Sequence, residues 1–176
     1  MVYGNWIQGL QQGTIVGSTY ANAGEIFSPY KSTQYEVGVK GDFGRFIATF
    51  DVFQISQPST IYESATNILS LNGEQRNRGL ELNIVGKLAK GLHITGGLML
   101  IDPRLTKKQG GKTDGWRAAG VSSVNFHVRL NYTLPWARKL ALTRAATYTS
   151  SQCLGTIVPR RRFPGWVRLD LGARYS

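Results

Sequence analysis

The chain has 176 residues, of which 41% are hydrophobic, 18% are charged and 21 are glycine, and its formal net charge is +11. This length suits one domain with a sizeable core, and the hydrophobic content is too high for a disordered chain. The single cysteine excludes an internal disulfide and a cysteine-based zinc cage. No apolar run approaches the roughly 18 to 20 residues that a membrane helix needs. The first residues, Met1 to Trp6, lack the basic and apolar regions of a signal peptide.

Apolar and polar residues alternate along most of the chain, which is typical of antiparallel strands with two different environments. In 125–134, for example, Phe126, Val128 and Leu130 alternate with polar residues. A strand of about 11 residues tilted by about 40° spans about 28 Å, close to the hydrocarbon thickness of a membrane. Eight strands are therefore expected, at 2–8, 34–43, 45–55, 77–88, 92–101, 122–134, 140–150 and 166–175.

The expected connections alternate strictly between long and short. Short turns fall at 42–44, 89–91 and 135–139, and the long loops are 9–33, 56–76, 102–121 and 151–165. This alternation is typical of an outer-membrane barrel, which has short periplasmic turns and long extracellular loops. Aromatic residues near the strand ends predict girdles at the two membrane interfaces: Trp6, Tyr35, Tyr132, Trp136, Trp166 and Tyr175.

The run G-E-Q-R-N-R-G-L-E-L at 73–82 ends a long loop and opens a strand. It resembles TonB-dependent siderophore receptors of the ferric-hydroxamate and pyoverdine type, and several shorter segments resemble the same family in the expected order. The resemblance implies that 1–176 is a partial barrel domain of a receptor with about 22 strands, without the plug domain. The motif supplies candidates for the lumen face, as a charge ladder that strengthens the wall more readily than as a ligand site: Glu74, Arg76, Asn77, Arg78, Glu81 and Asn83.

The resemblance also implies a function in ferric siderophore uptake across the outer membrane of a Gram-negative cell. This chain would supply barrel wall and extracellular loops, and TonB would act through the missing plug. Basic loop residues Lys107, Lys108 and Lys112 suit an anionic chelate or lipopolysaccharide phosphates. We expect no enzyme activity, cofactor or metal site. Nucleic-acid binding is disfavoured because the basic residues lie in loops or at alternate strand positions, not on one face.

Two other interpretations remain open. A self-contained eight-stranded membrane barrel, with an adhesive or structural role, would require 2–8 to pair with 166–175. A soluble all-β binding module would give the same alternation if a second layer covered the apolar face. If the chain is a barrel fragment, its first and last strands are unpaired edges.

Overall fold

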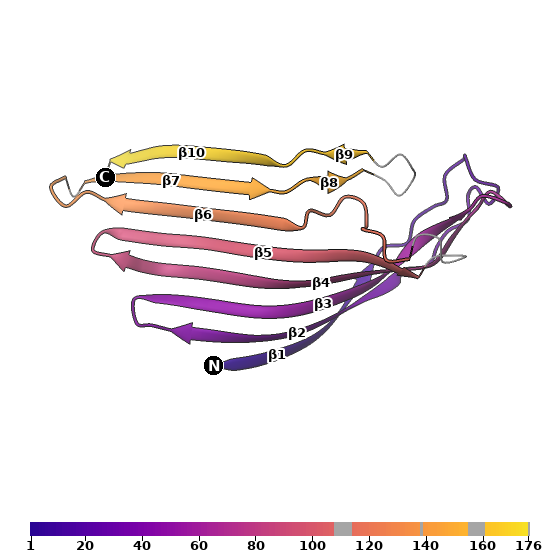
Figure 1. Ribbon diagram of the computed structural model, residues 1–176, viewed down its shortest axis with the longest axis horizontal. Coiled ribbons are helices and arrows are strands. Elements are labelled where there is room, and N and C mark those ends of the chain that lie inside the picture. Colours follow the sequence, from indigo (N-terminus) through magenta and orange to yellow (C-terminus); the bar gives the residue numbers. More distant parts are fainter. Residues whose placement is uncertain (108–113, 138, 155–160, 176) are drawn as a thin grey trace.

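The computed structural model describes residues 1–107, 114–137, 139–154 and 161–175. Its strands are β1 (Val2–Gln11), β2 (Tyr30–Asp42), β3 (Phe46–Glu63), β4 (Ile68–Ala89), β5 (Leu92–Lys107), β6 (Val124–Thr133), β7 (Leu140–Thr149), β8 (Gln152–Cys153), β9 (Arg162–Phe163) and β10 (Trp166–Tyr175). Eight of them form one antiparallel meander, β1-β2-β3-β4-β5-β6-β7-β10, and β8 pairs with β9 (Figure 1). The predicted all-β class is confirmed. Within these ranges no helix is long and apolar enough to cross a membrane.

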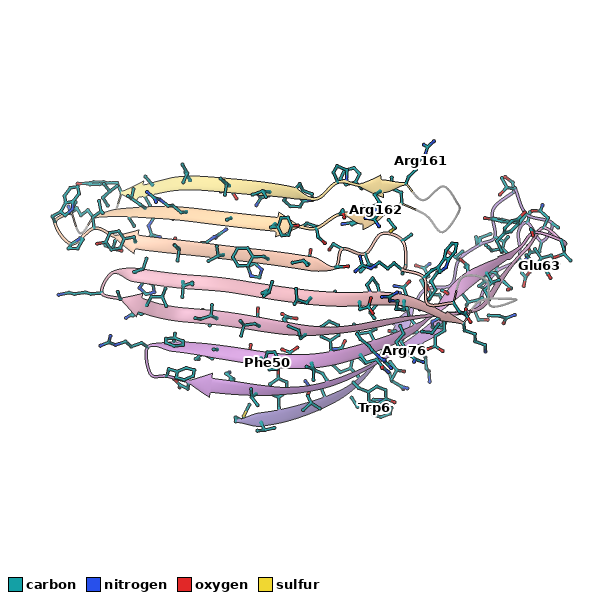
Figure 2. All side chains as sticks on the ribbon, in the orientation of Figure 1. Trp6, Phe50, Glu63, Arg76, Arg161 and Arg162 are labelled. Atoms are coloured by element: carbon teal, nitrogen blue, oxygen red, sulfur yellow. The ribbon has the colours of Figure 1, made fainter. Side chains whose placement is uncertain are left out.

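The eight-stranded sheet is a single layer; the two-stranded β8–β9 sheet lies beyond the ends of β7 and β10, and no helix occurs among the described residues (Figure 2). Large apolar side chains are therefore exposed: 59% of Val37, 73% of Leu169 and 82% of Leu171. A soluble domain would cover such a surface with another layer. The described residues provide no such cover, so the soluble all-β interpretation lacks the second layer that it requires.

Short turns join the strands at one end of the sheet. At the β2–β3 turn, Gly44 has φ 75° and its N–H donates to Asp42 Oδ1 at 2.8 Å, as in turns that an aspartate side chain stabilises. The rings of Phe43 and Phe46 stack beside this turn, 4.8 Å apart. The β4–β5 turn uses Gly91 at φ 77°. Both turns lie where the sequence predicted them.

At the opposite end, the β3–β4 hairpin is much longer than predicted. The segment 56–76 is not a loop: the ladder continues from Ser56 opposite Arg76 to Glu63 opposite Ile68, with an irregularity between Ser59 and Ile61. In this outer part both faces carry polar residues, so the alternation that marks a strand disappears although the backbone pairing continues. Figure 1 shows this hairpin reaching beyond its neighbours.

The two edges of the sheet are β1 and β10, which lie at opposite sides of Figure 1. Each pairs with one neighbour in the described part of the chain, β1 with β2 and β10 with β7. The closed eight-stranded barrel requires these two strands to pair with each other. The structure does not contain that pairing, which leaves the partial barrel as the architecture that fits.

Candidate functional site

The antiparallel register gives the sheet two chemically different faces, because residues directly opposite each other point to the same side. We define the polar face by Asn5, Glu36, Asp51, Asn77, Glu81, Asn83, Thr95, His127, Arg129, Thr143, Arg168 and Arg174. We define the apolar face by Val37, Val52, Leu80, Leu82, Leu98, Leu100, Phe126, Val128, Ala146, Leu169 and Leu171.

The polar face is hollowed. A depression of about 480 Å³ extends from β4 to β10 and is lined by His93, Asn131, Thr143 and Arg174 among others. These four residues belong to β5, β6, β7 and β10, so the hollow crosses several strands and is not confined to one hairpin. A polar face opposite an apolar one is the arrangement of a membrane barrel wall, with a polar interior and an apolar exterior.

Three carboxylates lie close together on the polar face. Asp51 is directly opposite Glu81 on β4, and Glu36 is its diagonal neighbour on β2. Asp51 is only 7% exposed, and the hydroxyl of Tyr3 donates to its Oδ2 at 3.5 Å. Among the described residues no such group is arranged to hold a metal ion. Glu36 and Glu81 are partly exposed and present negative charge on this face, with Asp51 buried between them.

Amide side chains orient two of these carboxylates. Asn83 Nδ2 donates to Glu81 Oε1 at 2.7 Å, and Gln34 Nε2 donates to Glu36 Oε2 at 2.8 Å. The sequence pointed to Glu81 and Asn83 but not to Glu36 and Asp51. The missing information was the register, which brings these three strands into line although their residues are far apart in the chain.

On this face two aromatic rings lie close to the glycines directly opposite them on the neighbouring strand. A Cβ added to Gly38 would be 2.5 Å from Tyr3 Cζ, and one added to Gly79 would be 2.6 Å from Phe53 Cζ. Each ring thus occupies the space that a side chain on the neighbouring strand would need. This filling of strand glycines by aromatic residues supports the local register.

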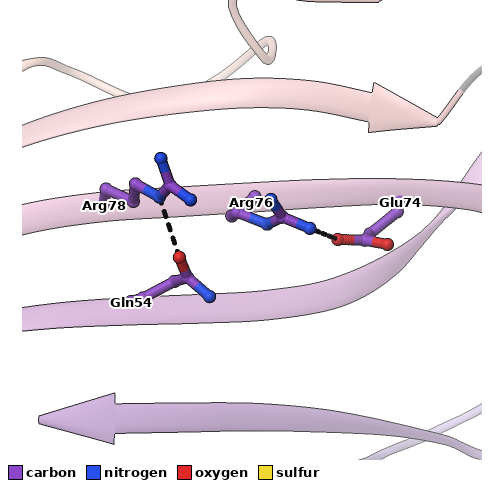
Figure 3. Close-up of polar contacts among 4 residues, drawn as sticks. All are labelled: Gln54, Glu74, Arg76 and Arg78. Atoms are coloured by element: carbon purple, nitrogen blue, oxygen red, sulfur yellow. Dashed lines mark hydrogen bonds and ion pairs between the residues drawn. The ribbon is translucent and has the colours of Figure 1, made fainter.

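The motif residues do not share one face, which corrects the prediction of a single lumen-facing set. Asn77, Glu81 and Asn83 lie on the polar face, whereas Glu74, Arg76 and Arg78 lie on the other side, above the apolar residues. Strand residues alternate between faces, so odd and even positions separate. Figure 3 shows the outer group: Arg76 Nη2 is 2.8 Å from Glu74 Oε1, and Arg78 Nε donates to Gln54 Oε1 at 2.8 Å.

The apolar face forms a band of limited height. On β10 it runs from Val167 to Tyr175, about 26 Å along the strand at about 3.3 Å per residue, which a tilt of about 40° reduces to a height of about 20 Å. An outward apolar band in a membrane barrel is about 25 Å tall. Arg144 interrupts the band opposite Leu130 and Leu171, at the middle of the apolar stretch of β10.

The predicted aromatic girdle residues fall into three groups. Trp6 and Tyr35 are directly opposite each other at the loop end of the band, and Tyr132 and Tyr175 belong to the same face near the turn end. Trp166 is paired with Thr149 on the polar face, so its assignment to an outer girdle is wrong; its neighbour Val167 occupies the apolar side. Trp136 lies outside the strands, in the turn between β6 and β7, and is 81% exposed.

The connection between β1 and β2 is anchored on the β3–β4 hairpin. Asn22 pairs with the backbone of Leu69: its Nδ2 donates to the carbonyl at 2.7 Å, and its Oδ1 accepts from the N–H at 3.0 Å. The rings of Tyr20 and Tyr62 lie 5.7 Å apart. Asn67, at φ 55°, donates to the carbonyl of Thr19 at 3.1 Å. These contacts give the loop one defined position.

We expect Asn22→Ala to release this loop, because the substitution removes both partners of the Leu69 backbone at a cost of about 2 kcal/mol. Hydrogen exchange at the Leu69 amide should accelerate by about tenfold or more, as should proteolysis between β1 and β2. The exposed Asn72→Ala is the matched control and should leave both rates unchanged. Equal rates in the two variants would show that Asn22 does not anchor the loop.

The basic loop candidates can be placed only in part. Lys107 is the last residue of β5, is exposed, and lies opposite Glu74 on the outer side of the sheet. Lys108 and Lys112 lie outside the described residues. The sequence predicted that all three are loop residues, whereas the structure places Lys107 in strand β5.

Comparisons with known proteins agree with this barrel wall. The family model "TonB dependent receptor-like, beta-barrel" matches residues 1–176. The ferrichrome receptor FcuA of Yersinia enterocolitica is 34% identical over 180 residues, which cover 99% of this chain and 24% of the receptor. The ferric preacinetobactin receptor BauA of Acinetobacter baumannii has 34% identity and a TM-score of 0.80 over 99% of this chain and 27% of its own. The ferric yersiniabactin uptake receptor FyuA of Yersinia pestis superimposes with a TM-score of 0.77 at 18% identity, over the same shares of the two chains.

The fold and its two faces define a wall segment of an outer-membrane β-barrel. The chain belongs to the TonB-dependent receptor family and spans about a quarter of the length of the curated relative that it matches. Proteins of this family are receptors of the outer membrane and not enzymes. The resemblance inferred from the motif at 73–82 is thus confirmed.

Proposed function

We propose that this chain forms part of the barrel domain of an outer-membrane receptor that takes up a ferric siderophore through TonB. The observation that carries the proposal is the sheet with one apolar face and one polar face that holds a depression, in a chain 34% identical to a ferrichrome receptor. Residues 1–176 would be one partial domain. Its apolar band would face outer-membrane lipid, and its polar face would line the lumen.

The orientation follows from the connections. The short turns after β2, β4 and β6 would lie on the periplasmic side, and the long β3–β4 hairpin with its docked loop would project outside the cell. In the complete receptor a plug fills the lumen, and TonB would act on that plug. The partly exposed carboxylates Glu36 and Glu81 would face this space and offer negative charge to basic groups on the plug.

The outer hairpins and loops would bind the ligand first. Lys108 and Lys112 remain candidates for attracting an anionic ferric chelate, since positive charge near an entrance raises the local concentration of anions. Lys107 is a weaker candidate for this role because its register places it on the outer side of the sheet.

A chimeric receptor tests the proposal: residues 1–176 replace the matching segment of the Yersinia enterocolitica ferrichrome receptor, which supplies the plug and the other strands. We expect a barrel that migrates differently before and after heating and that imports at least one iron-55-labelled chelate among ferrichrome, pyoverdine and preacinetobactin. Import should be absent in a strain without TonB. The receptor with its own segment is the control.

Two outcomes would contradict different parts of the proposal. A chimera that never forms a heat-modifiable barrel would contradict the place of this chain in the wall. A folded chimera in the outer membrane that imports none of the chelates, while the control imports ferrichrome, would contradict the transport function.

A further inference from the structure

Among the described strand residues, one charged side chain lies in the middle of the apolar band. It is Arg144 of β7, which is exposed. Its opposite and diagonal neighbours on this face are Val128, Leu130, Tyr132, Leu169, Leu171 and Ala173. None of these residues has a carboxylate, and no ion pair of Arg144 occurs in the part of the chain that the structure describes.

Arg144 is far from both ends of the band. Four residues separate it from Leu140 at the turn end of β7, and four separate it from Tyr148 near the loop end. At about 3.3 Å per residue and a strand tilt of about 40°, each separation corresponds to a height of about 10 Å. An extended arginine side chain is shorter than this height, so bending toward the headgroups does not bring its guanidinium fully out of the hydrocarbon.

Tyr132 on β6 is a second residue whose side chain favours the membrane interface but whose position lies inside the band. It is the diagonal neighbour of Arg144 toward the turn end and is 38% exposed. Its register row contains Ala173, two residues before Tyr175 on β10. Two residues of a tilted strand correspond to a height of about 5 Å. Since tyrosine rings lie at headgroup level in membrane barrels, the interface beside β6 is drawn inward.

A flat bilayer of normal thickness would make Arg144 unfavourable. A charge on the lipid side lowers the stability of a barrel far more at the middle of the bilayer than near an interface. Local thinning of the bilayer relieves much of this penalty, because it brings headgroups and water to the charge. The nearer headgroups are those on the turn side, where Tyr132 lies.

We propose that Arg144 and Tyr132 draw the phosphates of periplasmic-leaflet phospholipids toward the middle of the band. The bilayer beside β6, β7 and β10 is then thinner than it is beside β4. The inference rests on the membrane placement and orientation in the proposed function, but it does not depend on transport. The guanidinium of Arg144 would bind phosphate oxygens through paired N–H donors.

The first test measures the depth of a nitroxide label in the chimeric receptor, reconstituted in dioleoylphosphatidylcholine vesicles, from its collisions with oxygen and with a nickel complex. Leu171→Cys carries the label because Leu171 lies directly opposite Arg144, and all other cysteines are replaced by serine. We expect this label to lie about 5 Å nearer the headgroups than it does when Arg144→Leu is added. The control label at Leu82→Cys, on β4, should report the same depth in both backgrounds.

The second test measures urea unfolding of the chimera in bilayers of two thicknesses. In dioleoylphosphatidylcholine, Arg144→Leu should raise the folding equilibrium constant by about 30-fold, because the charge and the thinning that it requires are both removed. In the thinner dilauroylphosphatidylcholine the gain should be about fivefold or less. The control Arg129→Leu removes the same charge from the polar face of β6, and its effect should not depend on thickness.

The outcomes separate this inference from the proposed function. A Leu82 label in water would contradict the membrane placement itself. A Leu82 label in hydrocarbon, together with a Leu171 label whose depth does not change, would overturn only the thinning. A gain in stability that is equal in both bilayers would also overturn it. If Arg144→Leu lowers stability in both bilayers, Arg144 pairs with a carboxylate of another strand, and the inference is wrong.

Discussion

Leu82→Lys should destabilise the barrel by about 2 to 4 kcal/mol, because it places a charge on the lipid side of a central strand. Leu82 is 44% exposed and lies opposite Phe50 and Leu98. No carboxylate belongs to this register row among the described residues, so an ammonium there would have neither water nor a partner. Urea unfolding of the chimeric receptor in phospholipid vesicles, followed by tryptophan fluorescence, measures the loss.

Asn83→Lys is the matched control for this substitution. It introduces the same charge one residue further along β4, on the polar face and beside Glu81. There the charge would be hydrated and paired, so we expect stability within about 0.5 kcal/mol of the unsubstituted chimera. If the two lysines cost the same, the apolar face would not be the lipid-facing side.

Gly86→Ala should cost about 3 kcal/mol, although it adds only one methyl group. Gly86 has φ 147°, a conformation that residues with a Cβ rarely adopt. A Cβ there would overlap Phe46 Cα and lie 2.5 Å from the carbonyl oxygen of Arg45, so the backbone of β3 would have to move. The measurement is the shift in the urea midpoint of the chimeric receptor.

Gly172→Ala provides the comparison. A Cβ at Gly172 would be 3.7 Å from Thr143 Cβ, which is an ordinary contact, and Gly172 has no unusual φ. Such a substitution leaves stability unchanged or raises it by about 0.4 to 1 kcal/mol, because it restricts the unfolded chain. A similar loss in both variants would mean that Gly86 has no special role in the β3–β4 pairing.

Alternation identified the strands wherever one face is apolar and the other polar. The segments around Val37, Leu82 and Val128 were predicted for this reason. The outer parts of β3 and β4, within 56–76, were missed because the residues from Ser56 to Ser59 and from Glu74 to Arg76 are largely polar on both faces. Where both faces of a strand contact water, backbone pairing imposes no alternation of apolar and polar residues on the sequence. Strand ends beyond the membrane could therefore not be predicted from that alternation.

The face on which each strand residue lies was predictable from whether its position is odd or even within a regular strand. Glu74 and Glu81 are seven positions apart, and an odd separation within a regular strand puts two residues on opposite sides. The same argument separates Trp166 from Val167. By contrast, the pairing of Asn22 with Leu69 joins segments 47 residues apart and depends on how a loop folds back. No local pattern contains that information.

The rings that cover Gly38 and Gly79 have a consequence for whatever body occupies the barrel. Tyr3 and Phe53 each occupy space that a side chain at the facing glycine would need, so fewer side chains project from this stretch of the inner surface and it is smoother than a fully substituted one. If side chains of the inner wall interlocked with the body inside the barrel, those contacts would have to separate before that body could move. A smooth wall with a few charged side chains in fixed positions would release a neighbouring body once a few ionic contacts break.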